Sequence, residues 1–330
     1  MKQDPSATFP TIDPKEFRAA LRARDRMMAF HLFDPNVKLI DVGWRIEEKK
    51  KRITDQLTVR AHLRHKPQGE AFETFRSHNQ QRVISEEHIG FPVDIVEANY
   101  QTHQFWGWPP SPRARVHNPL RGGISISNER HYNYGTLGGI VRDRETNAKM
   151  ILSNWHVLGG TPYVPDGLKI FQPGYADGGA PPNTIARFKR HAMATGIDAA
   201  VAELTDQRKT INDQLGIGAV SGDAVPKLGM RVTKSGRTSE VTNGIITGIE
   251  GVRTVPYGGF MQVVRHVIHI AQDSDRRQVS SPGDSGSWWL ETSTRLAVGL
   301  HFAGSDHPEY GLAISMPKVL EALNVEILTS

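Results

Sequence analysis

The sequence predicts a mainly β protein in which a small α/β domain precedes two consecutive six-stranded antiparallel β-barrels. Short apolar segments bounded by Gly, Pro, Asn and Asp recur from about residue 122 to residue 315, which is typical of strands joined by turns. Three motifs with chemically reactive side chains lie at residues 156, 198 and 285. This is about the spacing that two successive barrels need between their functional loops.

The first predicted element is a helix over residues 14–33. Residues 1–13 are polar and contain proline, so we expect a flexible arm there. Asp13 is suited to cap the helix, and Pro14 to occupy its first position. We expect the helix to bury an apolar stripe that comprises Phe17, Leu21, Met27, Met28 and Phe30.

Two alternating segments, residues 37–47 and 53–63, predict a hairpin with a charged tip. After a polar stretch, residues 91–97 predict another short strand. We group residues 1–99 as an N-terminal α/β domain. It contains no catalytic constellation, so a role in regulation, in binding a regulatory protein partner or in forming a homo-oligomer is a hypothesis.

Residues 100–121 predict a linker rich in tryptophan and proline. Trp106 and Trp108 need burial, so we expect this linker to lie across a surface rather than to form a free tether. The body of the protein then spans residues 122–330, with a closing helix at residues 317–323. The strands predicted in this body are residues 134–141, 150–153, 169–172, 231–238, 244–249, 262–270, 295–301 and 312–315.

The composition is that of an ordinary globular protein, with 38% hydrophobic residues and no cysteine. Without cysteine there is no disulfide, and no thiol can act as a nucleophile or metal ligand. The first residues lead into no apolar segment of the kind that a signal peptide has, which predicts a cytoplasmic, bacterial protein. No apolar run approaches the ~20 residues that a membrane helix needs, so no membrane contact is predicted.

The net charge of +5 and the pI of about 9.4 raise the possibility of nucleic-acid binding. Basic residues cluster at residues 18–26 and 49–52, but no aromatic side chains that stack on bases are interleaved with them. The sequence therefore favours the polar face of a helix and a solvated hairpin tip, and a nucleic-acid partner is unlikely.

A metal site was weighed for the glycine- and proline-rich connection that follows residue 158. Asp166, Asp177 and His191 are of ligand type, but they do not have the tight spacing of metal ligands. We predict neither a metal nor a cofactor.

Residues 281–287, Ser-Pro-Gly-Asp-Ser-Gly-Ser, have the composition of a nucleophile turn. A serine hydroxyl is a weak nucleophile, so acyl transfer needs a general base beside it and hydrogen-bond donors for the oxyanion. Gly283 and Gly286 permit backbone angles that let the N–H groups of Gly283 and Ser285 converge into an oxyanion hole. The motif by itself also fits a surface turn, because Gly, Asp and Ser are turn residues.

Two upstream motifs favour the chemical interpretation. A predicted strand runs into His156, and Asp198 stands at the head of a short apolar strand. The order His, Asp, Ser, over residues 120–325, resembles the bacterial trypsin-like serine proteases of the chymotrypsin fold. The resemblance implies that Ser285 is the nucleophile, that His156 is the general base and then acid, and that Asp198 orients the imidazole.

The resemblance extends to the N-terminal region, where residues 41–45, 54–57 and 91–94 are similar to a region that precedes the protease domain in some bacterial trypsin-like proteins. It also bears on activation. In trypsin-type zymogens a freed amino terminus pairs with the aspartate before the nucleophile, whereas here residues 1–121 precede the barrels. Asp284 is therefore expected to brace the oxyanion turn by pairing with an internal Lys or Arg.

The substrate pocket that the resemblance implies includes Val279, Ser280 and His301. The valine stands where trypsin has an aspartate, so cleavage after Arg or Lys is not supported. The stretch around His301 resembles that of glutamyl endopeptidases, in which a histidine helps to hold an acidic side chain, and Ser280 adds a hydroxyl. The alternative, which we favour, is that His301 has a structural role.

Two functions stay open. The first is a serine endopeptidase that cuts a protein or peptide substrate through an acyl-enzyme and is controlled by a partner or by assembly. The second is an inactive or conditionally closed pseudo-protease that acts as a regulatory module. The intact His156, Asp198 and Ser285 favour the first.

Overall fold

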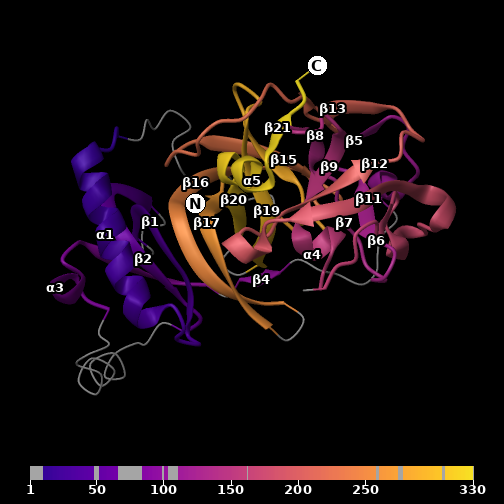
Figure 1. Cartoon of the computed structure of the whole chain (residues 1–330). Coiled ribbons are helices and arrows are strands. Elements are labelled where there is room, and N and C mark those ends of the chain that lie inside the picture. The colour runs from indigo at the N-terminus through magenta and orange to yellow at the C-terminus, as the bar shows by residue number, and fades with distance from the viewer. Residues whose placement is uncertain are drawn as a thin grey trace.

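The structure is a computed structural model that describes residues 10–47, 52–65, 84–98, 100–102, 111–161, 163–257, 260–273, 278–306 and 309–329. Strands make up most of its regular structure, so the predicted mainly β class is confirmed. The N-terminal helix and strands lie at one end of the molecule, beside a long hairpin, and the strands between residues 120 and 220 lie toward the other end (Figure 1).

Helix α1 (Pro14–His31) forms as predicted. The Asp13 carboxylate accepts a hydrogen bond from the Lys15 N–H at 3.0 Å, and Pro14 occupies the first turn. The helix buries Ala20, Ala23, Met27 and His31. The burial of Phe30 was predicted wrongly, because its side chain is 65% exposed. Phe30 lies seven residues after the buried Ala23, on nearly the same side of the helix, so packing at this end of the helix rather than the periodicity decides its exposure.

Strands β1 (Val37–Glu47) and β2 (Arg52–Leu63) form the predicted hairpin, whose tip lies outside the described residues. Strand β3 (Val93–Glu97) adds to β2 in parallel, after the short helix α3 (Glu86–Ile89). Strand β1 also pairs with β16 (Glu240–Tyr257), for example through Gly43 and Gly248. The N-terminal strands thus continue the sheet of the C-terminal half. The proposed division of the chain at residues 99 and 121 stays a prediction.

Six strands of the C-terminal half follow one another in the order β15-β18-β19-β20-β17-β16, and β16 returns to pair with β15. They form a closed, barrel-like ring. The bounds not yet given are β4 (Gln101–Thr102), β15 (Arg231–Gly236), β17 (Phe260–Gln272), β18 (Trp288–Glu291), β19 (Ala297–Asp306) and β20 (Glu309–Ser315). Strands β16 and β17 are longer than predicted, because pairing with each other and with β1 or β20 extends them.

The second sheet has eight strands in the order β21-β8-β9-β12-β11-β10-β6-β7, and β5, β13 and β14 form a separate small sheet. The bounds are β5 (Leu120–Gly122), β6 (Ser125–Asn128), β7 (Gly135–Thr136), β8 (Gly139–Asp143), β9 (Lys149–Ser153), β10 (Lys169–Phe171), β11 (Thr184–His191), β12 (Ala200–Leu204), β13 (Thr210–Gln214), β14 (Gly218–Ala219) and β21 (Val325–Ile327). The strand predicted at residues 134–141 is in fact two, β7 and β8.

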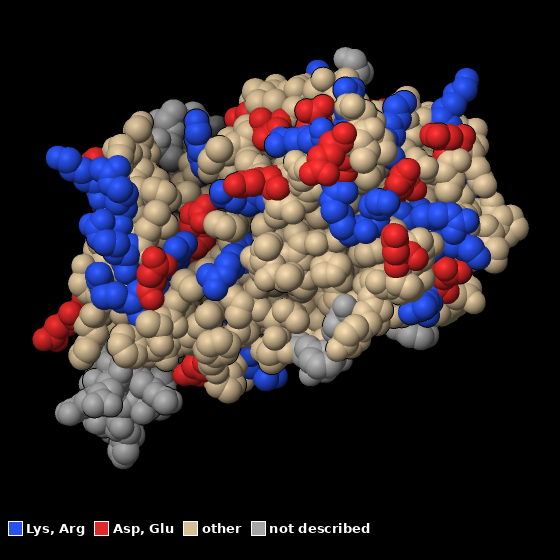
Figure 2. Space-filling view, viewed as in Figure 1, with Lys and Arg blue, Asp and Glu red and all other residues tan. Residues whose placement is uncertain are grey.

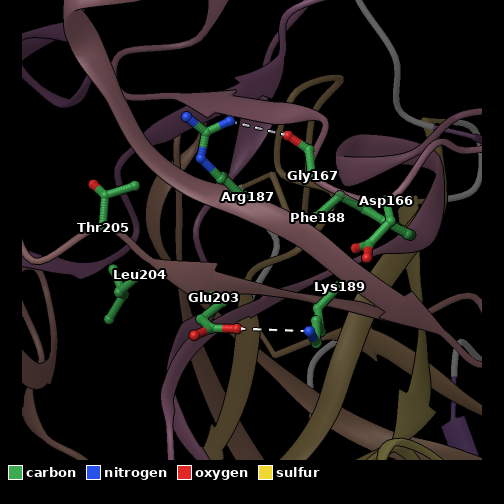
Figure 3. A pocket seen from close by; sticks show the side chains of 8 residues that line it. All are labelled: Asp166, Gly167, Arg187, Phe188, Lys189, Glu203, Leu204 and Thr205. Carbon is green, nitrogen blue, oxygen red and sulfur yellow. Dashed lines mark hydrogen bonds and ion pairs between the residues drawn. The ribbon is translucent and has the colours of Figure 1, made fainter.

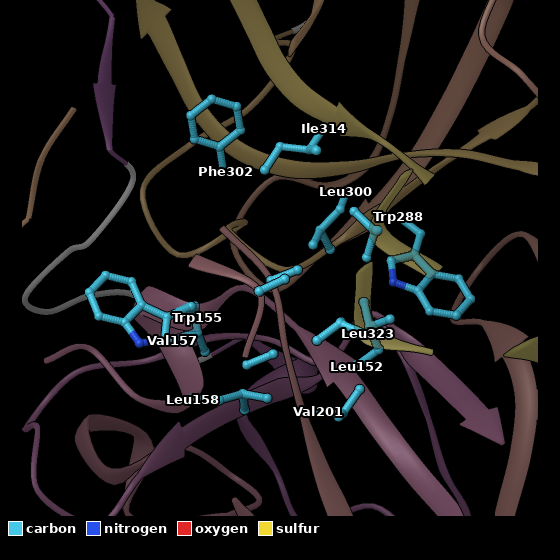
Figure 4. Close-up of a cluster of buried hydrophobic side chains, with 14 of the residues drawn as sticks. Leu152, Trp155, Val157, Leu158, Val201, Trp288, Leu300, Phe302, Ile314 and Leu323 are labelled. Carbon is cyan, nitrogen blue, oxygen red and sulfur yellow. The ribbon is translucent and has the colours of Figure 1, made fainter. Parts of the chain in front are cut away.

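The largest hydrophobic core lies between these sheets. It joins Leu152 of β9, Trp288 of β18, Phe302 of β19 and Leu323 of helix α5 (Met316–Leu323) (Figure 4). The predicted closing helix is therefore present, and its buried face completes this core. Among the described residues, the remaining helices are α4 (Trp155–Leu158) and the 3-10 turns η2 (Pro112–Ala114), η3 (Tyr175–Asp177), η4 (Pro181–Asn183) and η5 (Met193–Thr195).

A buried ion pair lies where the N-terminal strands join the larger sheet. The Arg60 guanidinium donates to both carboxylate oxygens of Asp41, at 2.8 and 2.5 Å, and neither side chain is exposed. His62 lies 3.2 Å from the same carboxylate. Although burial opposes ionisation, the charge of Arg60 keeps the pKa of Asp41 well below its usual value.

Removing one partner of this pair should destabilise the protein strongly. We expect Asp41→Asn to lower the free energy of unfolding by roughly 3–5 kcal/mol, because it leaves the Arg60 charge buried and unpaired. Urea unfolding measures the change. The double variant Asp41→Leu/Arg60→Met removes both charges and should be considerably more stable than Asp41→Asn. An equal loss in both variants would contradict this account.

Candidate active site

His156 and Asp198 are brought together by neighbouring strands of the eight-stranded sheet. His156 lies in the one-turn helix α4 that follows β9, and Asp198 lies just before β12, which pairs with β9. The His156 Nδ1 is 2.5 Å from Asp198 Oδ2, and the His156 backbone N–H donates to Oδ1 at 3.1 Å. Their side chains are only 1% and 0% exposed. The carboxylate therefore fixes both the ring and the backbone of the histidine.

Asn154 adds a further connection between the two loops. Its side-chain amide donates to the backbone carbonyl of Asp198 at 2.8 Å, inside the protein. Both the backbone carbonyl and the carboxylate of Asp198 are therefore bonded to the loop that carries His156. These two bonds limit rotation of the carboxylate relative to the imidazole.

Ser285 lies on a tight turn between the two sheets. Gly283 has a φ of 98°, a conformation that strains any residue with a Cβ. The Thr136 hydroxyl donates to the Gly283 carbonyl at 2.8 Å, and the Thr136 N–H donates to the Ser285 carbonyl at the same distance. From the other side, the Gly286 N–H donates to the His301 carbonyl at 2.9 Å. The turn is thereby fixed against both β7 and β19.

The side of the turn that carries Ser285 faces the helix that carries His156. A Cβ built on Gly135 would lie 2.6 Å from the side chain of Val157 and 3.2 Å from the Ser285 carbonyl oxygen. Only a residue without a side chain fits between them. Gly135 therefore lets the segment next to His156 approach the turn that carries Ser285. A direct contact between His156 and Ser285 stays a prediction.

Asp284 is buried beneath the turn and pairs with Lys234 of β15. The Lys234 ammonium lies 2.8 Å from Asp284 Oδ2, and neither side chain is exposed. The carboxylate also accepts from the backbone N–H groups of Ser281, Thr238 and Ser239 at 2.9–3.0 Å. The prediction of an internal cation for Asp284 is confirmed. Although burial opposes ionisation, Lys234 keeps the pKa of Asp284 well below its usual value.

A second buried ion pair lies beside the turn. Arg237 donates through its Nε to Asp177 Oδ2 at 2.9 Å and through a second nitrogen to Asp177 Oδ1. Its guanidinium also stacks on the ring of Tyr134, 3.8 Å from the ring centre. Asp177, which was considered as a metal ligand, is thus engaged by an arginine. The ring of Tyr134 lies against Gly283, which links this pair to the oxyanion turn.

The three residues predicted to bind substrate lie close to the turn and are buried. The Val279 carbonyl accepts from the Thr242 hydroxyl at 2.8 Å, and Ser280 is 1% exposed. His301 Nδ1 accepts from the indole N–H of Trp289 at 3.3 Å. This contact agrees with the structural alternative for His301, but none of these contacts involves a substrate. Their roles in substrate binding stay predictions.

Sequence reasoning missed Lys234, Arg237 and Tyr257 as residues that support the site. Lys234 lies in β15, and Arg237 directly follows that strand. A charged residue in a central strand is a usable signal of a buried ion pair, because a buried charge needs a partner. Tyr257 contacts Asp198 from the end of a long hairpin, and nothing near it in the sequence indicates that contact.

A hollow on the eight-stranded sheet is a separate feature. It has a volume of about 420 Å³ and is lined by Asp166, Gly167, Arg187, Phe188, Lys189, Glu203, Leu204 and Thr205 (Figure 3). Charged side chains of the hollow interact with one another or with its backbone. Lys189 lies 3.9 Å from Glu203, and Arg187 donates to the Gly167 carbonyl at 3.4 Å. We assign it no ligand.

The basic residues of α1 form a blue band at one end of the molecule (Figure 2). Arg18 and Arg22 are exposed, whereas Arg24 donates to the Glu250 carbonyl at 2.5 Å and Arg26 donates to that of Ile89. Part of this charge therefore attaches the helix to its neighbours. Within the part of the chain that the structure describes, no helix is long and apolar enough to cross a membrane.

No protein-family model matches the sequence, and no curated protein matches it. The solved structures that resemble this chain include bacterial trypsin-like serine proteases of the chymotrypsin fold. A Nocardiopsis protease and a Cellulomonas bogoriensis chymotrypsin are each 18% identical and cover 64% of this chain and 100% of their own, with TM-scores of 0.48 and 0.46. A glutamic acid-specific serine protease is also 18% identical and covers 63% of this chain and 100% of its own, with a TM-score of 0.48. These similarities settle neither activity nor substrate.

The pair beneath the turn predicts a pH dependence of stability. The pKa of Asp284 is lower in the folded protein than its usual 3.8, so the unfolded chain binds the proton more readily. The free energy of unfolding should therefore fall as the pH drops below about 3.8. We expect a steeper fall in the wild type than in the double variant Lys234→Met/Asp284→Asn, measured by urea unfolding between pH 6 and pH 3. Parallel curves would refute this role of the pair.

Proposed function

We propose that this protein is a serine endopeptidase that hydrolyses peptide bonds of a protein substrate through an acyl-enzyme on Ser285. The observation that carries the proposal is the buried contact of 2.5 Å between His156 Nδ1 and Asp198 Oδ2, beside a glycine turn that presents a serine. A carboxylate bound to one ring nitrogen leaves the other to act as the base, which is the arrangement that activates a serine hydroxyl.

In the proposed reaction the Ser285 Oγ attacks the scissile carbonyl carbon, and His156 Nε2 takes the hydroxyl proton. The oxyanion that forms is stabilised by the N–H groups of Gly283 and Ser285. His156 then gives its proton to the leaving amine as the peptide C–N bond breaks. Water repeats the sequence on the ester and releases the acid. No metal or cofactor takes part.

The brace under the turn supports this assignment. An oxyanion hole is effective only if its donors are already oriented when charge develops. Two hydrogen bonds from Thr136 and the buried Lys234–Asp284 pair restrict the turn in this way. Such a brace is more than a surface turn requires.

The finer assignments belong to the same proposal. We infer that Val279 and Ser280 line the pocket for the substrate side chain, since both lie near the turn. His301 was predicted with them, but its contact with Trp289 favours the structural role. A regulatory partner or a homo-oligomer contact through residues 1–99 and a cytoplasmic, bacterial location remain hypotheses from the sequence.

A conditionally closed site is the second candidate, and one contact favours it. The Ser285 hydroxyl donates to the Phe302 carbonyl at 3.3 Å, so the hydroxyl has an interaction besides any with the base. A protein of this kind would bind a partner before it acts. The intact His156–Asp198 contact favours the active enzyme.

Labelling with a fluorophosphonate probe tests the proposal without a guess at the substrate. We expect the wild type to gain one probe mass on Ser285, and Ser285→Ala to gain none. With any peptide that is cut, Ser285→Ala should lose roughly 10⁶-fold in kcat, and Asp198→Asn about 10⁴-fold. Unchanged hydrolysis by Ser285→Ala would rule out the mechanism. The absence of labelling in both proteins would favour the closed module.

A further inference from the structure

Tyr257 reaches the site from the other sheet. It is the last residue of β16, yet its hydroxyl donates to Asp198 Oδ2 at 2.5 Å. Its ring also stacks on the His156 imidazole, with 5.7 Å between ring centres and an angle of 21°. Trp155 packs edge-on against the Tyr257 ring, with 5.4 Å between ring centres. One side chain therefore contacts both members of the His–Asp pair.

The Tyr257 hydroxyl is suited to donate a hydrogen bond to Asp198 without losing its proton. Burial, with the Asp198 charge as the next cause, raises the pKa of Tyr257 well above its usual value, so the hydroxyl keeps its proton. The charge of Arg253, on the same strand, opposes this rise in the pKa of Tyr257. The Asp198 carboxylate thus receives donors from the His156 backbone, the His156 ring and Tyr257. Tyr257 and the imidazole therefore share Asp198 Oδ2.

We propose that Tyr257 is a positioning residue for the reaction. It acts through Asp198 and His156 and does not touch the substrate. Its hydroxyl fixes the carboxylate and its ring supports one face of the imidazole, so the end of the β16–β17 hairpin is part of the active site. This inference rests on the proposed function.

The test compares Tyr257→Phe with the wild type by the rate of fluorophosphonate labelling and by its pH profile. Loss of the donor should slow labelling roughly tenfold or more, because the His–Asp geometry loosens. Without the hydrogen bond from Tyr257, the Asp198 carboxylate keeps more of its negative charge and stabilises the protonated His156 more strongly. The pH of half-maximal rate on the acid side should therefore move upward. Tyr163→Phe, at a side chain that is 88% exposed, is the matched control and should behave as the wild type.

Several outcomes separate the two claims. If the wild type labels and Tyr257→Phe labels at the same rate with the same profile, only the role of Tyr257 is overturned. If the wild type does not label at all, the proposed function fails. Proton NMR adds a readout without turnover. The low-field signal of the His156 Nδ1–H should shift in Tyr257→Phe and not in Tyr163→Phe, and an unmoved signal would also count against the role.

A second, independent observation concerns the edge of β19. The Phe302 carbonyl accepts from the Ser285 hydroxyl, and the next two residues, Ala303 and Gly304, pair with β20. They also pair with β4, through Ala303 with Thr102 and Gly304 with Gln101, in the antiparallel sense. The backbone that directly follows the contact with Ser285 is therefore covered by the chain itself.

Such an edge is where a polypeptide substrate would be held. An extended chain binds an open sheet edge by adding a strand, and an edge beside the nucleophile places the scissile bond within reach. The segment before β4 is anchored. The Tyr100 hydroxyl lies 2.7 Å from His62 Nδ1, and the Tyr100 carbonyl accepts from Arg253 at 3.4 Å. The tyrosine is itself buried.

We infer that β4 is an autoinhibitory strand. Its backbone takes the hydrogen-bonding edge that an extended substrate requires, so β4 has to leave before a polypeptide is cut, whereas a small reagent still reaches Ser285. This inference also rests on the proposed function.

The double variant Gln101→Pro/Thr102→Pro removes the backbone donors of β4, whichever of its two pairs exchanges hydrogen bonds. We expect its kcat/KM for an extended peptide to rise roughly tenfold, since the hydrogen bond that β4 donates to β19 no longer opposes binding. Gln101→Ala/Thr102→Ala keeps both N–H groups and should match the wild type. The fluorophosphonate labelling rate should be similar in all three proteins.

If the proline variant labels normally without a gain on peptides, the inference about β4 is wrong. If the alanine variant gains as much as the proline variant, side chains rather than backbone pairing are responsible, which also overturns it. Labelling absent from all three proteins would instead reject the proposed function.

Discussion

The buried pair of Lys234 and Asp284 is the constraint on which the site depends. Both charges are removed from water, which is unfavourable unless they meet each other and further hydrogen-bonding groups. Asp284 satisfies that condition only when the N–H groups of Ser281, Thr238 and Ser239 converge on it. The pair therefore orients the turn that carries Ser285. The cation comes from β15, within the folded chain.

The candidate site lies where the two sheets meet. His156 and Asp198 come from the eight-stranded sheet, whereas the turn with Ser285 precedes β18 of the ten-stranded sheet. Thr136, Gly135 and Tyr257 connect the two sides. The long β16–β17 hairpin has a double role in this arrangement, since β16 pairs with β1 of the N-terminal region and ends at the tyrosine that contacts Asp198. The N-terminal strands are thus physically continuous with an element that touches the site.

The sequence predictions fail where long-range contacts decide. Helix α1 and the β1–β2 hairpin follow from local signals, the Asp13 cap and an alternating pattern, and both were predicted within a few residues. The exposure of Phe30 was not, because the width of the buried face depends on what packs against the helix. Strands β13, β14 and β21 were missed, since each is short and pairs with a partner that is not evident from its own residues.

The sequence by itself determined the mainly β class and the order of His156, Asp198 and Ser285, which follow from residue types whose chemistry or turn preference is local. The expectation of a cation for Asp284 came from the resemblance to trypsin-like proteases. Only the tertiary structure decided that the cation is Lys234, that Tyr257 donates to Asp198 and that residues 101–102 lie along β19. Each of those contacts joins segments far apart in the chain, and their proximity results from sheet pairing and burial, which no stretch of sequence expresses alone.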